Sequence, residues 1–169
     1  PGTLQPADVS ALAAHIDFFP TIAEIAGAKL DDATRRQIEG RSLLPLLRGE
    51  TPADWRTAIY YRYYHDPGHH NTRAHYGVRT ATHKLISYWK KDQWELFDLR
   101  SDPPELLNLY GQPGQEPITA ELKTTLARLR TELQDDDRFA REQPPAGVDG
   151  TVAALRAQGV GAFLVGEAF

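Results

Sequence analysis

The chain has 169 residues, of which 41% are hydrophobic and 25% charged, a composition typical of a globular protein with a buried core. Its net charge is -4 and its 19 Lys and Arg residues are scattered, which argues against a nucleic-acid partner. It contains no Cys, which excludes disulfides, Cys-ligated zinc and a Cys nucleophile within this chain. No apolar run reaches the roughly 18 to 20 residues of a membrane span. Because the chain opens with Pro1-Gly2 and has no Met, we expect a piece of a longer protein.

The first elements expected are helical. Residues 10–27, "SALAAHIDFFPTIAEIAG", carry apolar side chains at helical spacing, with Asp17 placed to cap the helix and Gly27 to end it. The stretch "RSLLPLLRG" predicts a second, shorter helix with Ser42 as its cap. Three of its side chains are expected to face inward: Leu43, Leu46 and Leu47. The polar connector between the two helices, "AKLDDATRRQIEG", is expected to be irregular.

From Ala58 the helical spacing gives way to short β-branched and aromatic runs separated by turn-forming residues. The runs are "AIYYRYY", "YGVRT", "HKLISYW" and "WELFDL". They predict four largely antiparallel strands, with hairpin turns near residues 80–82 and 90–93. The tyrosines of the first run alternate across a strand, so one face is open to core packing and the other to solvent or sugar contact.

Two further helices are predicted. "SDPPELLNL" begins with Asp102 at a cap position and Pro103 at the first helical position. "ITAELKTTLARLRTELQDDD" follows as an amphipathic helix expected to lie across the sheet, because its leucine stripe is too short for a coiled coil. The stripe consists of Leu122, Leu126, Leu129 and Leu133. The acidic run at residues 135–137 is interpreted as a solvated helix end, not a catalytic pair.

The densest polar cluster is "YYRYYHDPGHHNTRAHYGVRT", which holds four of the six His residues together with Asp66 and three Arg residues. Such a cluster can grip an anion, bind a metal or be an exposed loop between strands. The adjacent pair His69-His70 fits no strong metal-ligand spacing. His15 is expected to be a structural histidine. A G-x-S-x-G elbow, a phosphate-cradling glycine loop and an Asp-rich metal site are all missing from the sequence.

Five motifs in one order resemble the C-terminal portion of type I, formylglycine-dependent sulfatases, members of the alkaline-phosphatase-like superfamily. They are "HIDFFPTIAEIAG", "GRSLLPLLRG", "YGVRTATHKLISYW", "WELFDLRSDPPELLNL" and the leucine-striped helix. The run 60–80 resembles bacterial glycan sulfatases, the N-acetylglucosamine-6-sulfatase and iduronate-2-sulfatase relatives. His70 and His75 fit that pattern, whereas Arg62, His65 and Ala74 depart from it.

The resemblance implies an α+β fold in which a four-stranded antiparallel sheet carries a C-terminal amphipathic helix. Residues 1–50 would be the end of an alkaline-phosphatase-like α/β catalytic domain, and residues 51–137 the sulfatase C-terminal subdomain. Residues 138–169 would be a Gly-, Ala- and Pro-rich tail with one short helix at 152–158. A location in the bacterial periplasm or outside the cell is also implied.

The implied activity is hydrolysis of sulfate esters of a sulfated sugar or glycan. The formylglycine nucleophile and the calcium ligands would lie in the N-terminal catalytic part of the parent chain, and this chain alone is expected to be inactive. His70, Arg73 and His75 are the expected substrate-binding residues, with no catalytic or metal-binding residue assigned. Two alternatives are a phosphodiesterase or phosphonate hydrolase of the same superfamily, and a non-catalytic glycan-binding or assembly module.

Overall fold

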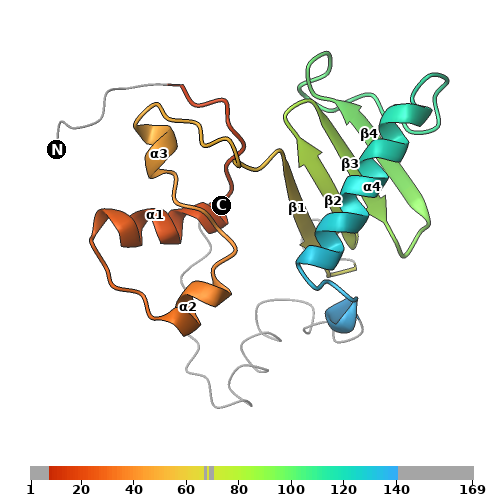
Figure 1. The fold of residues 1–169 in the computed structure, drawn as a ribbon. Coiled ribbons are helices and arrows are strands. Elements are labelled where there is room, and N and C mark those ends of the chain that lie inside the picture. Colours follow the sequence, from red (N-terminus) through yellow and green to blue (C-terminus); the bar gives the residue numbers. More distant parts are fainter. Residues whose placement is uncertain (1–7, 67, 69–70, 141–169) are drawn as a thin grey trace. The chain divides into compact units, whose positions relative to one another are not determined.

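The computed structural model describes residues 8–66, 68 and 71–140 (Figure 1). The chain forms two compact units, Pro1–Ile59 and Tyr60–Phe169. Two features expected from the sequence, His70 and the short helix at 152–158, therefore lie outside the described residues.

The first unit is helical. It contains the 3-10 turn η1 (His15–Asp17) and the helices α1 (Phe18–Ile25), α2 (Asp32–Gln37) and α3 (Leu44–Leu47). The expectation of an irregular connector is wrong, because α2 forms within it. The side chain of Asp31 accepts a hydrogen bond of 2.7 Å from the Thr34 N–H, which caps the new helix.

Asp17 does not cap α1 as expected but forms the polar centre of this unit. Its side chain is fully buried and accepts hydrogen bonds from the backbone N–H groups of Ala14 and Arg41, both at 2.8 Å. The guanidinium of Arg56 binds both carboxylate oxygens, at 2.5 and 2.7 Å. Burial opposes ionisation, but these donors hold the pKa of Asp17 below its usual value. Asp17 thus joins three segments that are distant in sequence.

The apolar side chains of α1 are mostly not covered. Ala23 is buried, but five large side chains in and beside the helix have exposed fractions between 52% and 65%. These are Ile16, Phe18, Phe19, Ile22 and Ile25. In α3 the inward leucines are Leu44 and Leu46, while Leu47 is exposed, so the expected set was partly wrong. Gly49 ends that helix with a φ of 83°, as predicted.

The second unit contains a four-stranded sheet, which confirms the predicted strands. Its members are β1 (Ala58–Tyr63), β2 (His75–Thr80), β3 (His83–Tyr88) and β4 (Gln93–Asp98), in the order β1-β2-β3-β4. The pairs β2/β3 and β3/β4 are antiparallel. Val78 lies opposite Leu85, which lies opposite Leu96, and all three are fully buried. This row is the centre of the core.

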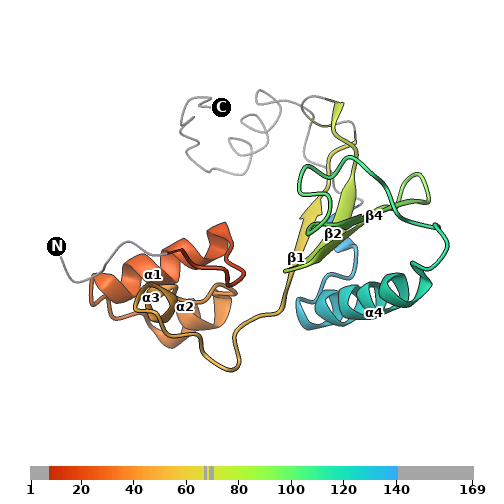
Figure 2. The same cartoon turned by 90° about the horizontal axis from the view of Figure 1, so that it is seen from above.

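Helix α4 (Glu116–Glu132) lies along one face of the sheet, as Figure 2 shows nearly edge-on. It contacts β2 and β3 through the buried side chains of Leu122 and Leu126. The prediction of an amphipathic helix packed on the sheet is confirmed. Leu133 lies past the helix end and is 36% exposed. The short turn η3 (Arg138–Ala140) follows.

The predicted helix in "SDPPELLNL" is wrong, because this stretch forms turns. Pro104 disfavours the helical conformation at Pro103, and Glu105 adopts a left-handed φ of 58°. Asn108 instead pairs with the outer edge of β4. Its Oδ1 accepts from the Leu96 N–H at 3.0 Å and its Nδ2 donates to the Trp94 carbonyl at 3.1 Å. The segment therefore covers a free strand edge.

Candidate sugar-binding edge of the sheet

The candidate site lies where β1 ends and β2 begins, on the sheet face opposite α4. Side chains alternate along β1, so Tyr61 and Tyr63 both lie on this face. Both rings contact the ring of His75 on β2, with centroids 5.8 and 5.7 Å away. Tyr88 of β3 joins the group at 5.6 Å from His75. We call these four residues the aromatic cluster.

His75 has a defined tautomer in this cluster. Its Nδ1 lies 2.7 Å from the carbonyl oxygen of Arg73. Because a carbonyl oxygen only accepts, Nδ1 carries the proton. The other ring nitrogen, Nε2, is then an acceptor when the ring is neutral and a donor when it is protonated. His75 can therefore offer Nε2 to a ligand hydroxyl or to an anion.

Arg73 is held by a neighbouring carboxylate. Its Nη1 lies 3.3 Å from Oδ1 of Asp66, and the two side chains are 36% and 14% exposed. The loop between them is tied by a hydrogen bond of 2.7 Å from the Gly68 N–H to the Thr72 carbonyl. Gly68 lies against the hydroxyl of Tyr63, so a side chain at this position would require the Tyr63 ring to shift. The structure thus brings Arg73 and His75 together, while the place of His70 is outside the described residues.

Deeper in the aromatic cluster, Tyr61 lies directly over the backbone of β2. A Cβ at Gly77 would come within 2.6 Å of its hydroxyl oxygen, so only glycine fits there. That hydroxyl is buried and has no hydrogen-bond partner in the described part of the chain. Burial, with Glu105 nearby, raises the pKa of Tyr61. Tyr88 donates to Glu95 at 3.0 Å, and burial together with this bond raises its pKa to about 12.

Next to the aromatic cluster, the face opposite α4 carries charged groups. Lys84 Nζ lies 2.6 Å from the Glu105 carboxylate and 6.0 Å from the ring of Tyr61. Arg79, opposite Lys84 in the sheet register, lies 3.8 Å from the same carboxylate. The left-handed backbone of Glu105 thus places a carboxylate between two cations.

Arg62, which departs from the glycan-sulfatase pattern, lies on the other face of the sheet. Its guanidinium binds Asp135 at 2.6 Å and lies 4.5 Å from the ring centroid of Trp89. The difference from the glycan-sulfatase pattern at residue 62 therefore does not alter a residue of the candidate site. Asp135 was interpreted from the sequence as part of a solvated helix end, and this is wrong, because its carboxylate is largely buried against Arg62 and Tyr60. His15 is exposed and contacts the ring of Phe18, so it is not a buried structural histidine.

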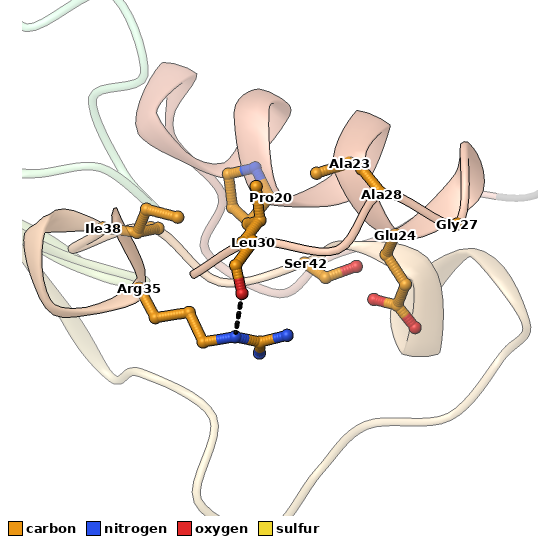
Figure 3. Close-up of a pocket in the computed structure, with 10 residues that line it drawn as sticks. Pro20, Ala23, Glu24, Gly27, Ala28, Leu30, Arg35, Ile38 and Ser42 are labelled. Carbon is orange, nitrogen blue, oxygen red and sulfur yellow. Dashed lines mark hydrogen bonds between the residues drawn. The ribbon is translucent and has the colours of Figure 1, made fainter. Parts of the chain in front are cut away.

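The first unit has a separate hollow of about 550 Å³, shown in Figure 3. Its walls are mostly small or apolar residues, among them Pro20, Ala23 and Ile38. Glu24 and Arg35 are its charged members, and Arg35 donates from Nε to the Leu30 carbonyl at 3.0 Å. This lining offers no nucleophile paired with a base. Sequence patterns gave no sign of the hollow.

Across residues 8–66, 68 and 71–140, no three His, Asp or Glu side chains converge closely enough to hold a metal ion. The same residues include no helix that is long and apolar enough to cross a membrane. Asp66 belongs to the polar cluster of the sequence, but no ligand-binding role was predicted for it. Its pairing with Arg73 depends on how the loop folds back, which residue spacing does not show.

Solved structures similar to this chain include sulfatases and phosphonate monoester hydrolases, and this likeness confirms the predicted fold class. One is a protein in complex with its substrate D-glucosamine-2-N,6-O-disulfate; it is 38% identical, with a TM-score of 0.64 over 72% of this chain and 24% of that one. Another is the phosphonate monoester hydrolase of Silicibacter pomeroyi, 26% identical, with a TM-score of 0.58 over 72% of this chain and 26% of that one.

The chain belongs to the N-sulphoglucosamine sulphohydrolase C-terminal family, whose model matches residues 1–132. Among curated relatives, the N-acetylglucosamine-6-O-sulfatase of Bacteroides thetaiotaomicron is 38% identical over 136 residues, or 79% of this chain and 24% of that protein. The resemblance to sulfatases inferred from the sequence motifs is confirmed. The chain spans about a quarter of the length of the first relatives it matches.

Proposed function

We propose that this chain is the C-terminal part of a sulfatase that hydrolyses sulfate esters of a sugar or glycan. The observation that carries the proposal is the family match over residues 1–132, joined with 38% identity to an N-acetylglucosamine-6-O-sulfatase. The chain has no Cys, and no C/S-x-P-x-R motif occurs in it. The formylglycine nucleophile is therefore assigned to the N-terminal catalytic part of the parent chain. A periplasmic or extracellular bacterial location is part of the same proposal.

Within this chain, the proposed substrate contacts are His70, Arg73 and His75. Two geometric observations support them: the hydrogen bond from Nδ1 of His75 leaves its Nε2 for a ligand, and Arg73 lies on the same edge. A side chain fixed on a strand binds at a lower entropic cost than a mobile one. The role of His70 rests on the sequence pattern alone.

Calcium is the proposed cofactor of the parent enzyme. The described residues contain no cluster of potential metal ligands, so none of them is assigned to the ion. When bound in the parent, calcium would supply positive charge against a developing anion. The contribution of this chain is to bind and orient the sugar.

Phosphonate or phosphodiester hydrolysis is the second candidate. It is favoured by the likeness to the phosphonate monoester hydrolase and by 31% identity over 117 residues to a multifunctional alkaline phosphatase superfamily protein of Trinickia caryophylli. The third candidate function is that of a non-catalytic glycan-binding or assembly module.

The deciding experiment measures turnover by the parent enzyme of N-acetylglucosamine-6-sulfate, an aryl sulfate and an aryl phosphonate at equal concentration. Higher kcat/KM on the sulfate esters supports the proposal, and higher kcat/KM on the phosphonate supports the second candidate. Sugar binding without turnover of any ester supports the binding module. The 169-residue chain assayed with added calcium is the matched control and is expected to show no turnover.

A further inference from the structure

Arg73 and Asp66 form an ion pair at the candidate site. Arginine side chains commonly bind sulfate, because a guanidinium offers several N–H donors to an anion. Here Nη1 of Arg73 lies 3.3 Å from Oδ1 of Asp66. An anion that approaches Arg73 also approaches this carboxylate. The attraction from one residue is thus opposed by the repulsion from the other.

The pair nevertheless offers complementary hydrogen-bonding groups. An ionised carboxylate only accepts hydrogen bonds and a guanidinium only donates them. Each hydroxyl of a sugar ring both donates and accepts. Two neighbouring ring hydroxyls can therefore satisfy both partners at once, one donating to Asp66 and the other accepting from Arg73. A sulfate group, which only accepts, satisfies just one of them.

The surroundings of the pair fit a sugar ring. Tyr63 packs against His75 with an angle of 25° between the ring planes, and its other neighbour is the ring of His65 at 5.7 Å. Aromatic rings present apolar faces beside polar tips. The hydrogen bond from Arg73 engages Oδ1 of Asp66, and within residues 8–66, 68 and 71–140 Oδ2 of Asp66 has no hydrogen-bond partner.

We propose that Asp66 and Arg73 together bind two neighbouring hydroxyl groups of the sugar ring, not the sulfate. Asp66 accepts from one hydroxyl while Arg73 donates to the other, and Asp66 also fixes the direction of the guanidinium. This inference rests on the proposed function and adds Asp66 as a specificity residue. It assigns recognition of the ring to this pair and leaves recognition of the anion to other cations.

The test compares the 169-residue chain with its Asp66→Asn variant by NMR titration with N-acetylglucosamine and with N-acetylglucosamine-6-sulfate. Asparagine keeps the shape of the side chain but removes its charge. We expect the affinity for both sugars to fall by a similar factor, about tenfold, since a hydrogen bond to a charged group is lost in both. The matched control is Asp54→Asn, which removes the carboxylate of another Arg–Asp pair, Arg41–Asp54, and is expected to change neither affinity.

Three results would overturn the inference. In the first, Asp66→Asn binds the sulfated sugar more tightly than the unaltered chain, as expected if Asp66 only masks an anion-binding Arg73. In the second, the variant binds both sugars unchanged, and in the third the unaltered chain does not bind the neutral sugar. Unchanged amide shifts at Val78 and Leu85 show that the variant is folded. A parent enzyme that hydrolyses sulfate esters equally well with and without Asp66 would refute this inference while supporting the proposed function.

Discussion

Arg62 and Asp135 form a buried ion pair that fastens the first strand of the sheet to the segment following α4. Nη1 of Arg62 lies 2.6 Å from Oδ1 of Asp135, and the two side chains are only 4% and 10% exposed. Tyr60 also donates to Asp135. The Arg62 guanidinium lies over the rings of Tyr64 and Trp89, at 4.7 and 4.5 Å. The pair holds β1 in place, and β1 in turn positions Tyr61 and Tyr63 on the face opposite α4.

Replacing Arg62 by Met should destabilise the second unit strongly. The substitution removes the nearest cation from the buried Asp135 carboxylate and leaves only Arg130, whose Nε lies 3.9 Å away, a change that typically costs about 3 to 5 kcal/mol. Urea unfolding followed by circular dichroism measures the loss in the free energy of unfolding. The matched control is Arg128→Met, which breaks the exposed pair with Glu132, whose side chains are 53% and 54% exposed, and should cost no more than about 1 kcal/mol. Equal losses in the two variants would contradict a special role for the buried pair.

The same pair predicts how stability depends on acid. Burial opposes ionisation of Asp135, but hydrogen bonds from Arg62 and Tyr60 hold its pKa below the ordinary value of 3.8. Since the folded-state pKa is the lower one, this contribution is fully present above pH 3.8 and is lost as the pH falls through the folded-state pKa. The pKa of Asp17 in the first unit is also lowered, so its contribution to stability is likewise lost as the pH falls. Unfolding measured between about pH 5 and about pH 2 should show a shallower acid dependence in Asp135→Asn, and an unchanged slope would contradict the assignment.

These two aspartates show where sequence reasoning stops. Patterns of alternation and helical spacing were sufficient for the four strands, their turns and α4, because each depends on neighbours within a few residues. Asp135 was misread as solvated because its partner is 73 residues away in the sequence. Asp17 was misread as a helix cap for the same reason, since Arg56 is 39 residues away. Long-range ion pairs leave no local pattern.

The candidate site was predictable in part. Residue types predicted a ligand-binding role for the stretch containing Arg73 and His75, and that role stays a prediction. They did not show that Asp66 neutralises Arg73 or that the Arg73 carbonyl sets the tautomer of His75. The first is a contact between residues seven apart in the sequence, and the second depends on the local backbone between residues two apart; residue types specify neither. Turns near Glu105 also escaped prediction, because Pro103 was read as a helix start without regard to Pro104, which disfavours the helical conformation before it.

Hydrogen exchange should separate the two units. The apolar side chains of α1 are exposed, so packing contributes little to holding this eight-residue helix together. The amides of β2 and β3 lie in the sheet beneath α4. We expect residues 18–25 to exchange faster than residues 76–88 when followed by mass spectrometry. Slower exchange in α1 than in the strands would show that this helix has found a packing surface that the structure does not contain.

Substitutions of His75 test directly whether this residue binds the sugar of the substrate in the parent enzyme. Nδ1 donates to the Arg73 carbonyl, so Nε2 is the atom left for the sugar. In His75→Asn, the amide nitrogen can keep the Nδ1 hydrogen bond but no atom replaces Nε2. In His75→Gln, the longer side chain places an amide near the Nε2 position. We expect kcat/KM on a sulfated glycan to fall about ten- to a hundredfold in His75→Asn, and by less in His75→Gln.

Both variants should turn over a small aryl sulfate normally, because that substrate has no sugar ring for His75 to bind. Equal losses on the glycan and the aryl sulfate would mean that His75 supports the fold rather than the sugar, and no loss on either would remove it from the site.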